Sequence, residues 1–214
     1  KAQFASLKSL LDTDYEVHVL DFSGHGDNRA ASPFTMDQFV QDVLDYMSKN
    51  NLNKANFFGY SMGGYVALNL ALNNPERVNK IMTLGTKFNW TKDAAEKESR
   101  MLDPEKIEEK VPQFAAHLAE VHKANNWNDV LRKTADMMVG LGNGTALDSL
   151  QLKNITPAVL ICTGSNDRMV SIEESREAAS KITNGKFKEL EGFRHEFERN
   201  DVQVLVDEIK RFIF

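Results

Sequence analysis

The stretch Phe57-Phe-Gly-Tyr-Ser-Met-Gly-Gly-Tyr-Val66 sets one serine among three glycines. An apolar run precedes it and a helical pattern follows it, so the serine is predicted at a turn from a strand into a helix. Gly59, Ser61 and Gly63 fit the pattern G-x-S-x-G. Such a turn is strained and pushes the serine oxygen outwards, and we expect side chains at both pattern glycines to collide with neighbouring backbone. Gly64 is expected to let the helix pack close to the sheet, and Ser61 is the first candidate nucleophile.

Composition limits the class of protein. The 214 residues favour one domain with an insertion over two domains. A net charge of -5 leaves no basic surplus, so we expect neither nucleic acid nor a membrane as a partner. The only cysteine, Cys162, lies in an apolar run and is expected to be a small buried strand residue. Because it has no partner for an internal disulfide, a reducing compartment, the cytoplasm, is the expected location.

Strand and helix patterns alternate along most of the chain. We expect strands at 15–21, 55–60, 77–85, 158–163 and 187–191, and helices at 2–11, 35–50, 62–73, 172–182 and 202–212. Alternation at short spacing predicts a mostly parallel sheet that helices flank on both faces. The predicted fold class is therefore α/β.

A segment of different character separates two such halves. Between Thr91 and Lys133, 17 of 43 residues are charged and no strand pattern occurs, so this part is expected at the surface. Asp103 followed by Pro104 indicates a helix cap and a first helical turn. The predicted organisation is a core in two parts with an inserted helical cap: core 1–87, cap 88–143 and core 144–214.

An activated serine needs a histidine base and an acid that orients the histidine. In a parallel sheet such partners come from loops at the carboxyl ends of strands. The predicted strand ending at Thr163 leads into a turn with Asp167, and the one ending at Glu191 leads into a turn with His195. The order Ser61, Asp167, His195 along the chain agrees with this architecture. These three are the candidate catalytic residues.

The other histidines fit less well. His25 precedes the serine and lies in the loop Ser-Gly-His-Gly, where a structural role and a substrate contact are equally open. His18 alternates with apolar residues, and His117 and His122 belong to the predicted cap. The spacing of His117 and His122 does not give a helical metal-binding face.

The chain resembles the α/β-hydrolase superfamily with a short helical cap. The resemblance is carried by four segments: Gly59-Tyr-Ser-Met-Gly-Gly64, Asp21-Phe-Ser-Gly-His-Gly26, Gly164-Ser-Asn-Asp-Arg-Met-Val170 and Gly192-Phe-Arg-His195. It implies Ser61 as nucleophile, His195 as general base and then acid, and Asp167 as its orienting carboxylate. It also implies the backbone amide of Met62 as an oxyanion donor.

The beginning of the chain departs from the family pattern. Members of the family carry a strand and a histidine-glycine loop that supplies the second oxyanion amide, whereas this sequence starts at Lys1, after that loop. We expect the N-terminal strands of an eight-stranded sheet to be missing from the sequence, so an export signal there would be invisible. Losing one oxyanion donor would lower the rate by about 100- to 1,000-fold.

The implied mechanism is acyl transfer in two steps through an acyl-enzyme, without a metal or an organic cofactor. The expected partner is a small carboxylic ester or thioester, bound under the cap by Trp90, Phe114 and Trp127. Carbon-carbon bond hydrolysis and cofactor-free lyase chemistry use the same residues and stay open. A small-ligand binder of the same fold without turnover is the alternative from another class. The sequence determines neither the substrate's chain length nor the oligomeric state.

Overall fold

The structure is a computed structural model that describes residues 1–29 and 33–214. The chain divides into two compact units. The first comprises Lys1–Val19, Tyr46–Phe88 and Leu147–Phe214, and the second comprises Leu20–Asp45 and Asn89–Ala146. The helix α2 (Met36–Lys49) belongs to both, because the boundary crosses it after Asp45. Residues 20–45 thus group with the inserted helices; the predicted division into core, cap and core stays a prediction.

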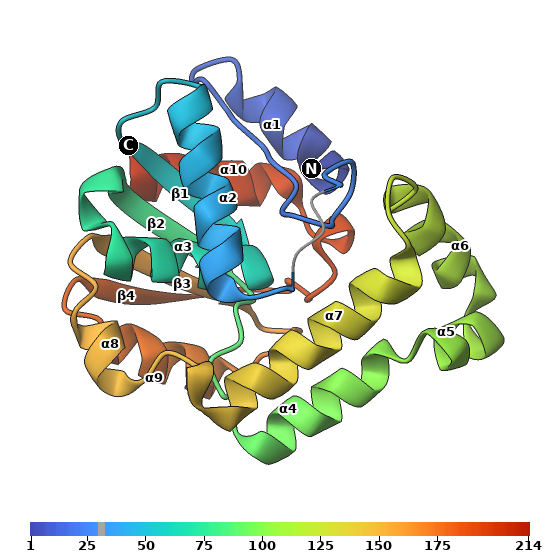
Figure 1. Cartoon of the computed structure of the whole chain (residues 1–214). Helices are drawn as coiled ribbons and strands as arrows, with labels where there is room; N and C mark the ends of the chain where they lie inside the picture. The colour runs from blue at the N-terminus through green and yellow to red at the C-terminus, as the bar shows by residue number, and fades with distance from the viewer. Residues whose placement is uncertain (30–32) are drawn as a thin grey trace. The chain divides into compact units, whose positions relative to one another are not determined.

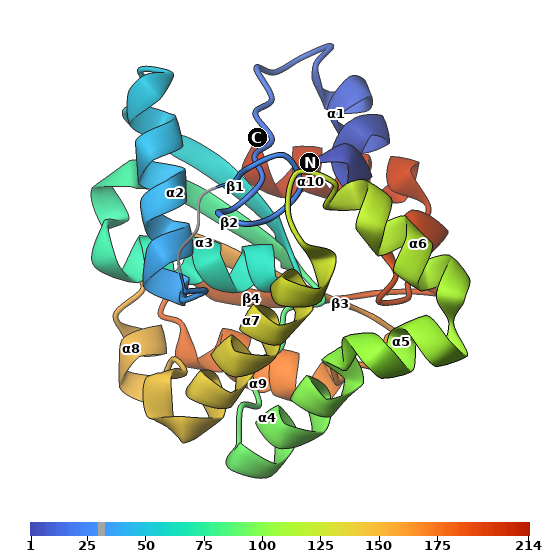
Figure 2. The same ribbon diagram turned by 45° about the vertical axis from the view of Figure 1, so that its right-hand side comes forward.

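A parallel sheet forms the centre of the first unit (Figures 1 and 2). Among the described residues its strands are, in spatial order, β1 (Ala55–Tyr60), β2 (Val78–Leu84), β3 (Ala158–Gly164) and β4 (Gly185–Leu190). Tyr60 pairs with Leu84, and Gly164 pairs with Leu190. The carboxyl ends of the strands therefore meet at one edge. The strands predicted at these four places are confirmed.

The predicted strand at 15–21 is wrong, because this segment has no regular secondary structure. A strand requires ladder hydrogen bonds to a neighbour, and none of the strands among the described residues pairs with it. Tyr15 and Val17 instead pack against an apolar cluster, and His18 Nδ1 lies 3.0 Å from the Tyr46 hydroxyl. Among the described residues, the alternating pattern of this segment therefore corresponds to packing of Tyr15 and Val17 on this cluster.

Helices and short helical turns complete the first unit. Their bounds are η1 (Ala2–Phe4), α1 (Ala5–Leu11), α3 (Met62–Asn73), η2 (Pro75–Arg77), α8 (Ser149–Lys153), α9 (Ile172–Lys181), η5 (Phe197–Arg199) and α10 (Val202–Ile213). Asp148 and Ser171 begin α8 and α9 with capping boxes, in which Gln151 and Glu174 bond back to the capping residue. The predicted helices at the α1, α2, α3, α9 and α10 positions are confirmed, whereas α8 was not predicted.

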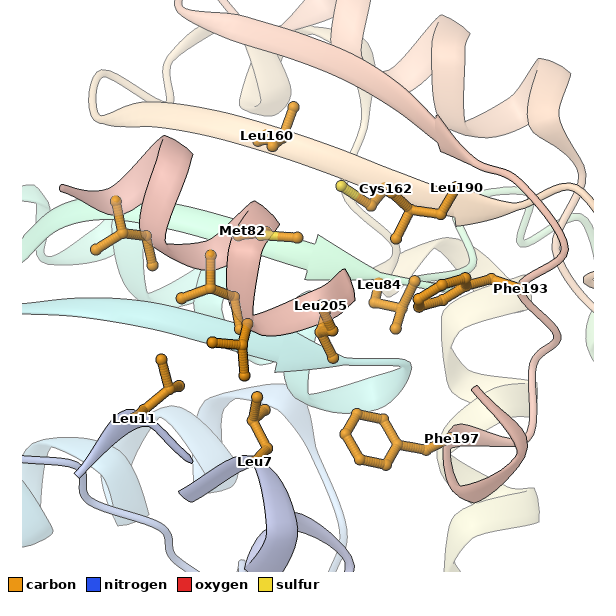
Figure 3. Packing of buried hydrophobic residues seen from close by; sticks show 13 residues of the cluster. Leu7, Leu11, Met82, Leu84, Leu160, Cys162, Leu190, Phe193, Phe197 and Leu205 are labelled. Atoms are coloured by element: carbon orange, nitrogen blue, oxygen red, sulfur yellow. The ribbon is translucent and has the colours of Figure 1, made fainter. Parts of the chain in front are cut away.

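One face of the sheet packs on α1 and α10. Figure 3 shows the apolar cluster that these elements form with the strands, which includes Leu7, Leu11, Met82, Leu84, Leu160, Cys162, Leu190 and Leu205. Cys162 is buried in β3, and burial raises the pKa of its thiol to about 12. The thiol therefore stays protonated and serves as a small apolar side chain, as the sequence predicts.

The opposite face of the sheet packs on α3 and α9. Side chains alternate along a strand, so Thr83 in β2 and Thr163 in β3 point away from the cluster of Figure 3. The Thr163 hydroxyl lies 2.6 Å from the hydroxyl of Ser175 in α9. A Cβ atom at Gly64 would clash with the hydroxyl of Thr86 and would come within 3.0 Å of Thr83 Cβ. Gly64 therefore lets α3 approach β2 closely, as predicted.

The second unit is built mainly from helices. They are α4 (Lys92–Ser99), η3 (Arg100–Leu102), α5 (Pro104–Lys110), α6 (Pro112–Val121), α7 (Trp127–Gly140) and η4 (Leu141–Thr145). Within this unit α4 and α7 lie side by side (Figures 1 and 2). Asp103 caps α5 by accepting from the backbone N–H of Lys106 at 3.1 Å, and Pro104 occupies the first helical turn. Asp103 is therefore confirmed as the residue that caps the beginning of α5.

No helix in residues 1–29 and 33–214 is both long and apolar enough to cross a bilayer.

Candidate active site

Ser61 stands at the turn from β1 into α3 with φ 49° and ψ -117°. A positive φ at a residue other than glycine costs about 1–3 kcal/mol and persists only where neighbours enforce it. Here the Ser61 N–H donates to the carbonyl of Leu84 at 2.8 Å, and the Thr86 hydroxyl donates to the carbonyl of Ser61 at 2.9 Å. The strained turn predicted from the sequence is therefore present, and these two hydrogen bonds hold it against the end of β2.

The glycines around Ser61 have unequal roles. A Cβ atom at Gly59 would overlap the backbone of Gly63 and Gly64, so no larger residue fits there. At Gly63, apart from its chain neighbours and the backbone of its own helix, no described atom lies within 4 Å of the position of a Cβ, so the predicted collision at this residue is wrong. Gly63 lies in the first turn of α3, and its missing side chain would point into open space. Gly59 and Gly64 are the glycines that let this turn close.

Asp167 lies in the turn that follows β3. Its Oδ1 atom accepts from the backbone N–H groups of Met169 at 2.8 Å and Val170 at 2.9 Å. Burial of this side chain, which is 1% exposed, opposes ionisation. Hydrogen bonds from His195 and from the two amides outweigh that effect and lower the pKa of Asp167 below its ordinary value. Asp167 is therefore a buried, ionised carboxylate.

His195 lies in the loop after β4, where its Nδ1 atom is 2.9 Å from Asp167 Oδ2. Its side chain is 12% exposed, so one edge of the imidazole reaches the surface while Nδ1 faces the acid. Since the carboxylate accepts a hydrogen bond from Nδ1–H, the neutral imidazole presents its Nε2 lone pair. The structure thus brings together the two residues that the sequence placed after neighbouring strands.

Gly85 connects this pair to the serine turn. Leu84, which accepts the Ser61 N–H, is followed by Gly85 with φ +61°. A Cβ atom at Gly85 would lie 3.1 Å from Asp167 Oδ2 and 3.2 Å from His195 Nδ1. The pair therefore rests on the backbone next to the residue that holds Ser61. In the described part of the chain the Ser61 hydroxyl itself makes no hydrogen bond to His195.

Backbone contacts join the loops that carry the acid and the histidine. The Ser165 N–H donates to the Leu190 carbonyl at 3.0 Å, and the Asn166 N–H donates to the Phe193 carbonyl at 2.9 Å. In return the Gly192 N–H donates to Ser165 Oγ at 2.7 Å. These contacts fix the distance between the two loops, and sequence reasoning did not find them.

Asn200 holds the far side of the histidine loop. Its Oδ1 atom accepts from the Arg194 N–H at 2.7 Å, and its Nδ2 atom donates to the carbonyls of Arg194 at 2.9 Å and Glu196 at 3.2 Å. The side chain of Asn200 therefore supplies this loop with backbone hydrogen bonds of the kind that a neighbouring strand would make. An asparagine shortly after the predicted histidine turn was its only signal in the sequence.

Tyr60 contacts the same loop from the serine side. Its hydroxyl donates to the carbonyl of His195 at 2.7 Å. The Tyr60 ring lies 5.5 Å from the imidazole of His195 and 5.5 Å from the ring of Phe197, measured between ring centroids. The residue directly before Ser61 thus touches the loop that carries His195.

The predicted substrate contacts lie in the second unit. Trp127 packs against the small cluster of Ile107, Ala115 and Leu131, Trp90 is half-buried, and Phe114 is 49% exposed. The candidate catalytic residues belong to the first unit. The role of these three aromatic residues as substrate contacts therefore stays a prediction.

His25 has its partners within the second unit. Its ring stacks on Phe34 with centroids 4.6 Å apart, and its Nδ1 atom lies 3.0 Å from the Ser23 carbonyl. Burial lowers the pKa of His25, and the neighbouring His122 lowers it further. His122 Nδ1 accepts from the Gly26 N–H at 3.1 Å. These contacts give both rings a structural role in tying residues 23–26 to the end of α6.

Within residues 1–29 and 33–214, no three His, Cys, Asp or Glu side chains form a group that would hold a metal ion.

Comparison with known proteins places the chain in a family. A model of the α/β-hydrolase fold matches residues 1–134. The chain belongs to this family. The predicted fold class is therefore confirmed for the α/β-hydrolase fold.

Similarity to individual α/β-hydrolases is partial in sequence and extensive in structure. Ethanol acetyltransferase 1 of Cyberlindnera fabianii is 35% identical over 72 residues, which are 34% of this chain and 22% of that protein. The pimeloyl-acyl-carrier-protein methyl ester esterase of Aliivibrio fischeri is 36% identical over 76 residues, which are 36% of this chain and 28% of that protein. The chain thus spans less than a third of either relative.

The crystal structure of NosK from Streptomyces actuosus matches 98% of this chain and 90% of its own, with a TM-score of 0.83 and 18% identity. At that identity the likeness shows the α/β-hydrolase fold alone.

Proposed function

We propose that this α/β-hydrolase is a serine hydrolase that cleaves a small carboxylic ester or thioester through an acyl-enzyme. The observation that carries the proposal is the hydrogen bond between Asp167 and His195, next to the strained turn of Ser61. A buried carboxylate that orients an imidazole beside an outward-pointing serine is the arrangement that activates a hydroxyl as a nucleophile.

In the proposed mechanism His195 accepts the Ser61 proton on Nε2 while Ser61 Oγ attacks the carbonyl carbon. The imidazolium that forms is stabilised by Asp167, which is ionised because its pKa is lowered. His195 then protonates the leaving group, and water repeats the sequence on the acyl-enzyme. Asp167 stays ionised throughout, because hydrogen bonds from the backbone amides of Met169 and Val170 stabilise its negative charge.

Met62 is the proposed oxyanion donor. It is the first residue of α3, so its N–H belongs to those that have no acceptor within the helix. The positive end of the helix dipole adds to the attraction for a developing negative oxygen. This role rests on its place directly after Ser61, at the beginning of α3.

The substrate class is supported by the relatives. The names of the two relatives describe a methyl ester esterase and an alcohol acetyltransferase. Both activities move an acyl group, and they differ in whether water or an alcohol accepts it. We therefore propose an ester or thioester as acyl donor and water as acceptor, with transfer to an alcohol as the second candidate. Ethanol added to the assay separates the two, because acyl transfer yields the ethyl ester.

Labelling with a fluorophosphonate, followed by mass mapping of the adduct, tests the proposal. We expect one adduct, on the peptide that contains Ser61, and loss of the adduct and of p-nitrophenyl butyrate hydrolysis in Ser61→Ala. The matched control is Ser180→Ala, which removes an exposed serine in α9 and should leave both intact.

Turnover that survives in Ser61→Ala would remove this residue from the nucleophile role. A wild-type protein that binds a small ester without forming the adduct would instead favour the non-catalytic binder of the same fold.

A further inference from the structure

Tyr60 occupies the variable position before the serine in G-x-S-x-G, a position to which the pattern assigns no chemistry. It is the last residue of β1 and pairs with Leu84, whose carbonyl also accepts the Ser61 N–H. Its backbone is therefore as firmly placed as that of the serine turn. Any contact made by its side chain is fixed relative to Ser61.

The side chain of Tyr60 reaches the histidine loop by a hydrogen bond and a ring contact. Its hydroxyl donates to the His195 carbonyl at 2.7 Å. That carbonyl and the imidazole are attached to the same Cα atom. A hydrogen bond to the carbonyl therefore restricts the position of the imidazole. The ring of Tyr60 also contacts the imidazole and the ring of Phe197, with centroids 5.5 Å from each. The hydrogen bond and the ring contacts of Tyr60 together restrict movement of the loop that carries His195.

The tyrosine stays a donor under ordinary conditions. Burial raises the pKa of Tyr60 well above its usual value, and the negative charges of Glu198 and Asp167 raise it further. The hydroxyl is therefore protonated at neutral pH and can donate to the carbonyl.

The other restraints on the loop act from elsewhere. Asn200 binds the carbonyls of Arg194 and Glu196, and the acid loop binds Phe193. Neither of these restraints comes from β1, the strand that ends directly before Ser61. Among the described residues, the side-chain hydrogen bond that joins β1 to the loop of His195 is the one that the Tyr60 hydroxyl donates.

We propose that Tyr60 is a positioning residue that restricts the movement of His195 relative to Ser61, the residue from which His195 takes the proton. The inference rests on the proposed function and extends it to a residue that the catalytic pattern does not assign. Misplacement of a catalytic group by about 1 Å is enough to lower a rate by about 100-fold.

The variant Tyr60→Phe tests the proposal, because it keeps the ring in the apolar cluster and removes only the hydroxyl. We expect kcat for p-nitrophenyl butyrate to fall by about 10- to 100-fold with KM changed less than twofold. Backbone amides of residues 192–197 should exchange faster with deuterium, whereas those of β4 should be unchanged. The matched control is Tyr46→Phe, which removes a hydroxyl 3.0 Å from His18 Nδ1 and should alter neither measurement.

Two results would overturn different statements. If wild type forms the Ser61 adduct, and Tyr60→Phe matches wild type in kcat and in exchange of residues 192–197, the positioning role is wrong and the proposed function stands. If wild type forms no adduct, the proposed function fails. The exchange measurement then still decides whether the hydroxyl holds the loop, and unchanged exchange overturns that claim too.

Discussion

The carboxyl edge of the sheet and the helical second unit differ in how their side chains are held. At the edge, Asp167 accepts from two backbone amides, and its loop exchanges backbone hydrogen bonds with the loop of His195. In the second unit, a small buried cluster of Ile107, Ala115 and Leu131 packs on partly buried neighbours. Several large apolar side chains there are exposed, including Met101, Val111, Phe114 and Val121.

This difference corresponds to two requirements of the proposed hydrolase. Chemistry depends on positions accurate to a fraction of an ångström, which backbone hydrogen bonds and a buried sheet provide. Selection of a substrate depends on surfaces that can change without harming those positions. Substitutions at the sheet edge should therefore alter turnover, and substitutions in the second unit should alter stability or selectivity.

The largest effect is expected for Asp167→Asn. The amide cannot stabilise the imidazolium and favours the wrong tautomer of His195, so kcat for ester hydrolysis should fall by about 10,000-fold. The measurement is steady-state hydrolysis of p-nitrophenyl butyrate, with the melting temperature as a check on folding. Asp136→Asn, at an exposed position of α7, is the control and should retain full activity. Activity within tenfold of wild type in Asp167→Asn would show that another acid orients the histidine.

The next effect concerns the glycines beside the serine. Gly59→Ala forces a methyl group into the backbone of α3, and we expect a loss of about 3 kcal/mol or more in the free energy of unfolding. Gly63→Ala meets no described atom and removes a helical glycine, so it should stabilise by about 0.5–1 kcal/mol. Urea denaturation measures both. Equal losses in the two variants would contradict the packing described for this turn.

Leu131→Ala should have a smaller and more local effect. It empties part of the small cluster with Ile107 and Ala115, which costs about 2–3 kcal/mol. We expect deuterium exchange to accelerate in α5, α6 and α7, while the strands of the first unit keep their protection. Val139→Ala, on an exposed position of α7, is the control. Faster exchange throughout the sheet would show that the two units unfold together.

Much of the fold could be predicted because the signals are local. The apolar runs of β1 and β3 identify strands without knowledge of their partners, and Asp167 and His195 follow from their places after strand ends. The segment 15–21 failed because an alternating pattern does not say whether a neighbouring strand exists. Gly63 failed for a similar reason, since a glycine in a pattern does not reveal which atoms face it.

The supporting residues of the site could not be predicted. Tyr60 and Asn200 act through hydrogen bonds to carbonyls of the histidine loop, and no spacing in the sequence marks such a contact. Gly85 matters because of its approach to Asp167 and His195, which depends on loops far away in the chain. These residues become visible only when the loops are seen together.

The buried carboxylate at the edge of the sheet predicts a pH effect on stability. The pKa of Asp167 is lowered in the folded protein, so its carboxylate binds a proton more readily after unfolding. The resulting stabilisation is present above the ordinary value of 3.8 and is lost as the pH falls through the lowered value. Asp167→Asn should therefore flatten the pH dependence of the unfolding free energy below about pH 4, as measured by urea denaturation. If the unfolding free energy of the variant depends on pH in this range as that of wild type does, other carboxylates determine the acid dependence.

The smallest effect on stability is expected for Phe114→Ala. Its side chain is 49% exposed, so truncation should change the free energy of unfolding by less than about 0.5 kcal/mol. If Phe114 is a substrate contact, as the sequence predicts, and meets the acyl chain, the same variant raises KM for p-nitrophenyl octanoate more than for the acetate, and leaves kcat for the acetate unchanged. Val111→Ala, also exposed in this unit, is the matched control. A uniform change in kcat for both esters would contradict the comparison, because it would mean that the second unit shapes the chemistry as well as the choice of substrate.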